Sequence, residues 1–183
     1  MKQVLIDGKI DYVKWDMNRQ MTEVGSLALS RERQSEVVFR YYLGLYEFLE
    51  RLTTEFPNIL FESCSAGGNR FDPGMLYYMP QTWCSDNTDA VERLKIQYGT
   101  SMIYPMSSIG AHVSAVPNHQ VNRTSSMKMR CQVAIFGCFG LELDLTSCTD
   151  NELKEIANYV KLYHSLRNVI DVQSMLPPSL LVD

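Results

Sequence analysis

The feature that most limits the fold is the alternation of short β-like segments with longer helix-like segments. The β-like segments, short and rich in β-branched and aromatic residues, are residues 10–15, 59–64, 81–85, 101–105 and 139–144. Helix-like segments are predicted at 31–56, 88–98 and 125–136, and a further helix begins near residue 149. Strands that alternate with helices form parallel βαβ units. The predicted fold class is therefore α/β with a parallel sheet, either an open doubly wound sheet or part of a (β/α)₈ barrel.

Helix periodicity is clearest between residues 31 and 56. Apolar residues recur there at steps of three and four, which places them on one helix face; they are Val38, Tyr41, Tyr42, Leu45, Leu49 and Leu52. Thr149 and Glu152 have the spacing of a capping box. The helix that they begin is predicted to turn five side chains inward: Leu153, Ile156, Ala157, Val160 and Tyr163. Residues 106–123 are predicted to form a polar loop.

Composition excludes several classes of protein. The chain has 183 residues, 45% hydrophobic and 21% charged, with a net charge of −4, as in ordinary soluble domains. An acidic chain of this kind does not predict a nucleic-acid or membrane-surface partner. Neither a secretory signal pattern nor an apolar run of membrane-spanning length is visible. We therefore expect a cytoplasmic protein.

The five cysteines are predicted to be reduced thiols. They are Cys64, Cys84, Cys131, Cys138 and Cys148, an odd number at irregular spacing. A zinc site using His112 or His119 is the alternative, but no Cys-x-x-Cys pair occurs. We therefore predict no metal, and we expect the sequon at 122–124 to be unused.

Polar residues gather at the predicted carboxyl ends of the strands. Lys14, Asp16, Cys64, Asp86 and His112 all lie at or just after such ends. Both barrels and open α/β sheets place their active sites there. No glycine-rich dinucleotide motif and no Walker loop is present, which disfavours a nucleotide site.

Asp16 and Asp86 could supply the two carboxylates that a retaining glycoside hydrolase requires, one as nucleophile and one as acid/base. Lys14 and Arg19 could keep Asp16 ionised. Two aromatic residues nearby, Trp15 and Trp83, could present ring faces to a sugar, and Trp83 could also desolvate the site of Asp86.

Structural and catalytic alternatives stay open at this point. Asp86 could cap the following helix, and Asp16 could be a salt-bridged turn residue. Cys64 with His112 could form a cysteine-hydrolase pair, although no third member is evident. Four other carboxylates have no assigned role: Glu62, Asp72, Asp89 and Asp144.

Several long motifs resemble bacterial α-galactosidases of glycoside hydrolase family 36. They are Lys-Trp-Asp-Met-Asn-Arg at 14–19, Glu-Ser-Cys-Ser at 62–65, Arg-Phe-Asp-Pro-Gly-Met-Leu-Tyr-Tyr-Met-Pro at 70–80, Trp-Cys-Ser-Asp-Asn-Thr-Asp-Ala at 83–90, Arg-Leu-Lys-Ile-Gln-Tyr-Gly-Thr at 93–100 and Gly-Ala-His-Val-Ser-Ala-Val-Pro-Asn-His-Gln at 110–120. The resemblance covers nearly the whole chain, and motifs of this length in this order are very specific.

The resemblance implies a (β/α)₈ catalytic barrel and a retaining mechanism without a metal or cofactor. It assigns Asp16 as nucleophile at the end of the fourth barrel strand and Asp86 as acid/base at the end of the sixth. The implied substrates are α-galactosides of the melibiose and raffinose type. The implied sugar-binding set, with its close neighbours, is Lys14, Trp15, Met17, Asn18, Cys64 and Gly67, to which the residues themselves add Trp83.

Two departures from the family are visible. Its members often have a glycine-rich run after Glu-Ser-Cys-Ser, whereas this chain has Ala66-Gly67-Gly68-Asn69. Family members are also several-fold longer. The resemblance predicts a partial barrel, roughly strands 4 to 8, at residues 1–168, and the start of a connection to a C-terminal β-domain at 169–183.

A partial barrel would expose two sheet edges. We therefore expect an isolated chain to be inactive or weakly active unless a missing barrel half or a second copy completes the site. The alternatives kept are a catalytically incomplete fragment, an α-N-acetylgalactosaminidase and a galactosyl-transferring enzyme.

Overall fold

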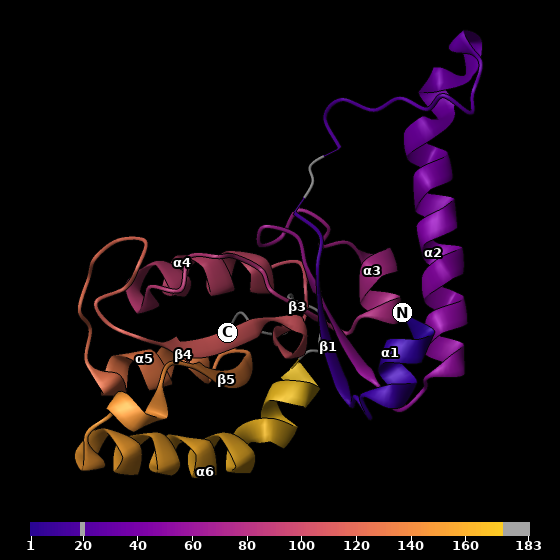
Figure 1. The fold of residues 1–183 in the computed structure, drawn as a ribbon. Helices are drawn as coiled ribbons and strands as arrows, with labels where there is room; N and C mark the ends of the chain where they lie inside the picture. Colours follow the sequence, from indigo (N-terminus) through magenta and orange to yellow (C-terminus); the bar gives the residue numbers. More distant parts are fainter. Residues whose placement is uncertain (19–20, 174–183) are drawn as a thin grey trace. The chain divides into compact units, whose positions relative to one another are not determined.

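The computed structural model describes residues 1–18 and 21–173. It divides into two compact units, Met1–Pro80 and a second that begins at Gln81, and each is described by itself. Both units contain parallel strands joined through helices (Figure 1). The predicted α/β class with parallel pairing is confirmed.

The first unit is built on two parallel strands. Its elements are α1 (Lys2–Asp7), β1 (Tyr12–Asp16), the 3₁₀ helix η1 (Arg31–Glu36), α2 (Val37–Glu55), β2 (Leu60–Cys64) and α3 (Pro73–Tyr78). Tyr12 lies opposite Leu60, and Asp16 lies opposite Cys64. The two strands therefore end at the same level, which brings Asp16 and Cys64 together as the βαβ prediction requires.

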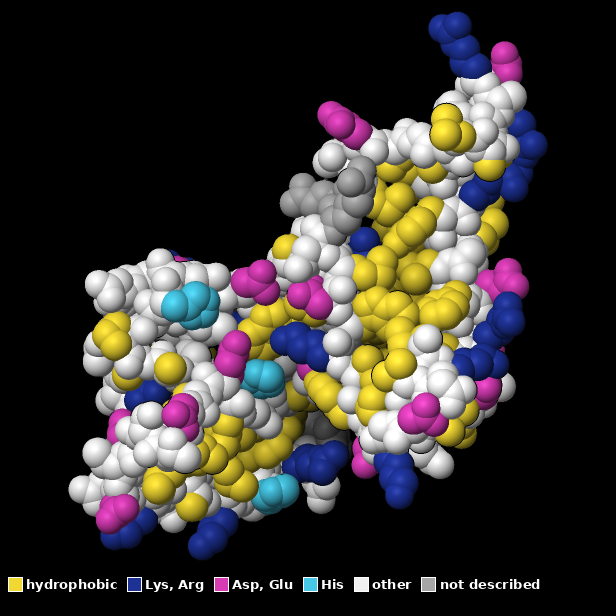
Figure 2. Space-filling view, viewed as in Figure 1, with side chains coloured by type: hydrophobic (Ala, Val, Ile, Leu, Met, Phe, Trp, Pro, Cys, Tyr) yellow, Lys and Arg dark blue, Asp and Glu magenta, His cyan; other side chains and the backbone are white. Residues whose placement is uncertain are grey.

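The core of this unit lies between the strands and the helices. Its buried residues are Leu5, Leu49, Leu52, Phe61, Met75 and Met79. Leu49 and Leu52 confirm the predicted apolar face of α2 in its second half. Toward its start, Phe39 is 67% exposed and Leu43 53% exposed, and apolar side chains remain visible along this helix (Figure 2).

The second unit has the same local plan. Its elements are β3 (Gln81–Thr82), α4 (Ala90–Ser101), the 3₁₀ helix η2 (Met106–Ser108), β4 (Gly110–Ser114), α5 (Met127–Ala134), β5 (Cys138–Glu142), the 3₁₀ helix η3 (Leu145–Ser147) and α6 (Asp150–Gln173). β4 and β5 are parallel, with Gly110 opposite Cys138. The core consists of Val113, Met127, Cys131, Ala134 and Ile156.

The predicted strand at 101–105 is wrong. Helix α4 continues to Ser101, and the carbonyl of Thr100 then accepts bonds from the amides of Ile103 and Tyr104. Ile103 is 78% exposed, so this apolar run does not enter the core. The strand lies instead at Gly110–Ser114, inside the segment predicted as a loop.

The capping box at the start of α6 is confirmed. The amide of Thr149 donates to Oε2 of Glu152 at 3.0 Å, and the amide of Glu152 donates to the Thr149 hydroxyl at 3.3 Å. Of the predicted inward residues, Ile156 is buried, whereas Ala157 is exposed. The inward face therefore matches the prediction only in part.

Helix α6 continues to Gln173, past the predicted boundary at 168. The rest of the predicted connection, 174–183, lies outside the described residues. Within residues 1–18 and 21–173, no helix has both the length and the apolar character to cross a membrane.

Candidate active site

Asp16 ends β1 as an exposed carboxylate that a neighbouring amide holds. The side-chain nitrogen of Asn18 donates to Oδ2 of Asp16 at 3.0 Å. The oxygen of the same amide accepts the backbone N–H of Ala66 at 2.7 Å. Asn18 therefore links the predicted nucleophile to the turn that follows β2.

That turn is closed by backbone and hydroxyl contacts. The amide of Ser65 donates to the carbonyl of Gly67 at 3.2 Å, and the Ser65 hydroxyl donates to the carbonyl of Met17 at 2.5 Å. Gly67 has φ of 81° and Ala66 has φ of 46°. Ala66 thus adopts the left-handed conformation that glycine tolerates better, so the turn forms despite this departure from the family pattern.

Cys64 lies directly opposite Asp16 and is 5% exposed. Burial, followed by the adjacent Asp16 carboxylate, raises the pKa of the Cys64 thiol to about 11, although Lys14 acts in the opposite direction. A thiol with this pKa stays protonated near neutral pH and is not an activated nucleophile. The raised pKa therefore disfavours the cysteine-hydrolase alternative.

We expect iodoacetamide to label Cys64 about a hundredfold more slowly at pH 8 than the same cysteine in the urea-unfolded chain. Only the thiolate reacts, and a raised pKa makes it scarce, so the rate should rise as the pH approaches 11. Asp16→Asn removes one cause of the raised pKa and should increase labelling at pH 8. Peptide mass spectrometry measures the rates, and Asp11→Asn is the control. Equal labelling in both variants would contradict the contact.

Lys14 occupies the same exposed face of β1 as Asp16, because side chains alternate along a strand. Its ammonium lies 3.6 Å from Oε1 of Glu62, a carboxylate that is 0% exposed. The Tyr12 hydroxyl also donates to Glu62. Glu62 thus has a structural role that the sequence reasoning missed, although the register of the strands places Lys14 opposite it.

Trp15 has a core role that differs from the predicted sugar contact. It lies on the opposite face of β1 from Asp16 and packs against the core of the first unit. Its ring meets the Phe48 ring edge-on at 5.6 Å. Strand alternation is the physical reason. Met17, next along the chain, lines a small cavity of about 10 Å³ beside Cys64. Arg19 lies outside the described residues.

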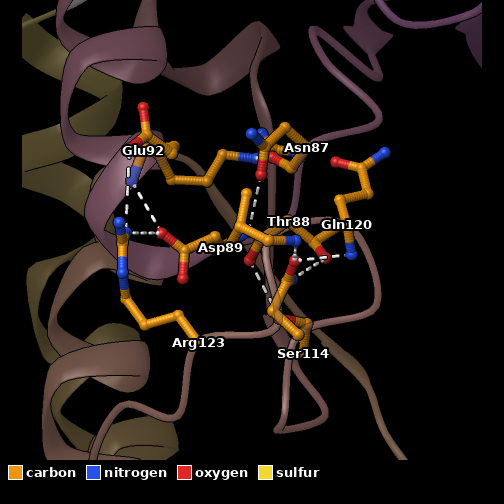
Figure 3. A network of polar contacts seen from close by, with 10 residues as sticks. Asn87, Thr88, Asp89, Glu92, Ser114, Gln120 and Arg123 are labelled. Carbon is orange, nitrogen blue, oxygen red and sulfur yellow. Dashed lines mark hydrogen bonds and ion pairs between the residues drawn. The ribbon is translucent and has the colours of Figure 1, made fainter.

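Asp86 is exposed and does not cap the following helix, so that structural alternative is wrong. The N-cap of α4 is Asp89, whose side chain accepts the amide of Glu92 at 3.1 Å. Asp89 also pairs with Arg123 (Figure 3). Because Asp89 meets the helix's need for a capping acceptor, the carboxylate of Asp86 stays available to solvent or substrate.

A second set of contacts holds the residues that follow Asp86. The Ser114 hydroxyl, at the end of β4, donates to the carbonyl of Thr88 at 2.9 Å (Figure 3). The side-chain nitrogen of Asn118 donates to the Thr88 hydroxyl at 2.9 Å. The segment bearing Asp86 is therefore bonded to the strand and loop that follow it in sequence.

Trp83 is 4% exposed, so it offers no open ring face for a sugar. The Arg93 guanidinium lies 4.4 Å from its ring centroid, and the His112 ring lies 4.7 Å away. His112 is in the middle of β4 rather than at its end, which corrects the prediction for that residue. A side chain on Gly140 would collide with His112, since a Cβ there would lie 2.4 Å from its ring.

The other carboxylates without an assigned role are also structural. Asp72 caps α3 by accepting the amide of Met75, and Asp144 caps η3 by accepting the amide of Thr146. All five cysteines are free thiols, as predicted. In the part of the chain that the structure describes, no three His, Cys, Asp or Glu side chains gather as a metal site would need. Asp16 and Asp86 are left as exposed carboxylates with predicted catalytic roles, one in each unit.

Comparison with known proteins gives one consistent family. A family model described as Melibiase matches residues 1–173. The chain is 61% identical to the α-galactosidase AgaA of Geobacillus stearothermophilus over 93% of its own length and 23% of that protein's. It is 52% identical to the bifunctional α-galactosidase/sucrose kinase AgaSK of Mediterraneibacter gnavus, over 92% of this chain and 17% of that protein. The chain therefore spans less than a quarter of the length of these relatives.

The solved structures that match this chain belong to the same family as these relatives. A crystal structure of the Geobacillus enzyme with raffinose matches 92% of this chain and 23% of its own, with a TM-score of 0.88. That protein carries an aspartate-to-asparagine substitution, and another, solved with stachyose, carries an aspartate-to-alanine substitution. The two substituted aspartates are as far apart in their sequence as Asp16 and Asp86 are in this chain.

Proposed function

This chain belongs to the melibiase family, glycoside hydrolase family 36, and on that premise we propose that it supplies both catalytic carboxylates of a retaining α-galactosidase. The observation that carries the proposal is the spacing of Asp16 and Asp86. It equals the spacing of the two aspartates that were substituted in the raffinose- and stachyose-bound relatives. The side chains of Asp16 and Asp86 are exposed, whereas Glu62 and Asp89 near them have structural contacts, and this difference supports the same assignment.

In the proposed reaction, Asp16 attacks the anomeric carbon of a terminal α-linked galactose. Asp86 protonates the departing glycosidic oxygen and then removes a proton from the water that releases the sugar. Two inversions at one carbon give net retention. The proposed reaction uses no metal and no cofactor.

The residues around Asp16 suit a sugar rich in hydroxyl groups. Lys14 and Asn18 offer N–H donors beside the carboxylate, and the Cys64 thiol stays protonated. With Gly67 and Met17 nearby, these residues form the proposed galactose contact. Trp83 is left out of that contact because it is buried, and Trp15 because its partly buried ring packs against the core of the first unit.

We further propose that the chain corresponds to strands 4 to 8 of a barrel, and that a missing half or a second copy completes the site. The proposed substrates are raffinose- and melibiose-type sugars, and the proposed compartment is the cytoplasm. The coverage of less than a quarter of the relatives supports the proposal of an incomplete site.

The experiment compares two preparations on 4-nitrophenyl α-galactoside and raffinose. One is this chain alone. The other is a chimera in which residues 1–173 replace the matching segment of the Geobacillus enzyme. We expect weak or no turnover by the chain and hydrolysis by the chimera, with α-galactose as the first anomer seen by NMR. A folded chimera without activity, or β-galactose as the first product, would overturn the proposal. Chromatography of the products separates hydrolysis from galactosyl transfer.

A further inference from the structure

Arg93 is a buried cation close to Asp86 that the proposed mechanism does not use. It lies in the first turn of α4 and is only 3% exposed. A buried guanidinium is costly unless hydrogen bonds satisfy its N–H groups. The groups that satisfy it therefore indicate what the side chain does.

Two of its bonds are to the residues on either side of Asp86. Nε of Arg93 donates to the carbonyl of Asn87 at 2.8 Å. Its second terminal nitrogen donates to the carbonyl of Ser85 at 2.7 Å. One rigid planar group thus fixes the peptide that joins Ser85 to Asp86 and the peptide that joins Asn87 to Thr88.

The remaining contacts of Arg93 fix the guanidinium itself. The first terminal nitrogen donates to the carbonyl of Gly110, at the start of β4, at 3.1 Å, and to the sulfur of Cys84 at 3.2 Å. The guanidinium also lies 4.4 Å from the centroid of the Trp83 ring. The group that holds Asp86 is therefore anchored to a strand of the same unit.

We propose that Arg93 is the positioning residue of the acid/base, holding Asp86 by bonding the backbone on both sides of it. This inference rests on the acid/base role proposed for Asp86. A carboxylic acid must meet the glycosidic oxygen in line to transfer its proton, and misplacing such a group by 1 Å can cost about a hundredfold in rate. Lysine could not replace Arg93, because an ammonium lacks the planar fork that reaches two carbonyls.

The test compares Arg93→Lys with Gln97→Met in the full chain. Gln97 is a matched control on the same helix: its buried side-chain nitrogen donates to two backbone carbonyls, those of Val133 at 2.9 Å and Phe136 at 3.0 Å. The first readout is hydrogen exchange at the amides of Asn87 and Asp89, which bond within the segment. We expect exchange about tenfold faster or more in Arg93→Lys and unchanged in Gln97→Met.

The second readout separates positioning from a general structural role. Raffinose has a poor leaving group that must be protonated as it departs. The dinitrophenolate of 2,4-dinitrophenyl α-galactoside departs without a proton. In whichever preparation turns over, the chain or the chimera, Arg93→Lys should slow kcat for raffinose about tenfold to a hundredfold. The dinitrophenyl substrate should change by less than about threefold, and KM should stay the same.

Each other outcome has a definite meaning. Unchanged exchange, equal loss on both substrates, or equal effects in Gln97→Met would overturn the proposal. So would an Arg93→Lys chain that fails to fold while Gln97→Met folds, because Arg93 would then act on the whole unit. If no preparation turns over either sugar, the proposed function fails, and the exchange measurement still decides whether Arg93 holds this segment.

Discussion

Asp16→Asn is expected to lower kcat/KM for 4-nitrophenyl α-galactoside in the chimera by on the order of 10⁴-fold or more. The amide keeps the shape of the side chain but cannot form the glycosyl-enzyme bond. Asn18 still has an oxygen acceptor in the substituted side chain, so the bond that it makes to this position can persist. The loss should therefore be chemical rather than structural.

Azide provides the sharper test of this assignment. In Asp16→Gly the small anion can attack the anomeric carbon from the side that the carboxylate occupied. The expected product is β-galactosyl azide, which NMR identifies. Asp11→Asn, an exposed aspartate just before β1, is the matched control and should keep its activity. An active Asp16→Asn variant would refute the nucleophile role.

Asp86→Ala is expected to lower kcat for raffinose by about 10²- to 10⁴-fold. The same change should affect 2,4-dinitrophenyl α-galactoside much less in the first step, because its leaving group departs without a proton. Breakdown of the galactosyl-enzyme still needs a base, so the intermediate should accumulate and a burst of dinitrophenol should appear. Stopped-flow absorbance measures the burst.

Azide added to Asp86→Ala should yield the opposite anomer from Asp16→Gly. It attacks the β-linked galactosyl-enzyme in place of water and gives α-galactosyl azide. Asp150→Ala, an exposed acid at the start of α6, is the control. If Asp86→Ala formed the β anomer, Asp86 would be the nucleophile and not the acid/base. Equal losses of kcat on both substrates would refute the acid/base role.

Much of this protein was predictable because its signals are local. The helix over Val37–Glu55 follows from apolar residues spaced at three and four, and the strand at Leu60–Cys64 from a short run ended by polar residues. The capping box at Thr149 needs only a hydroxyl and a carboxylate at the right separation. The motifs around Asp16 and Asp86 likewise lie in contiguous sequence, so the family could be assigned from them.

The tertiary structure decided what depends on partners far apart in sequence. Gly110–Ser114 has little β-forming character of its own and becomes a strand because β5 pairs with it, while the more apolar run at 101–105 ends a helix. Trp15 faces the core because the helices cover only one side of β1.

The same distinction applies around Asp86, the proposed acid/base. The sequence allowed Asp86 to cap α4 and assigned no role to Asp89, whereas the helix starts at Ala90 and Asp89 is its N-cap. Arg93 in a helix would ordinarily be exposed, and only the packing of α4 against its neighbours buries it beside Ser85 and Asn87. The sequence by itself identified the residues that we propose carry the chemistry. The tertiary structure determined which side chains hold them in place, because burial and hydrogen-bond partners arise only once distant segments meet.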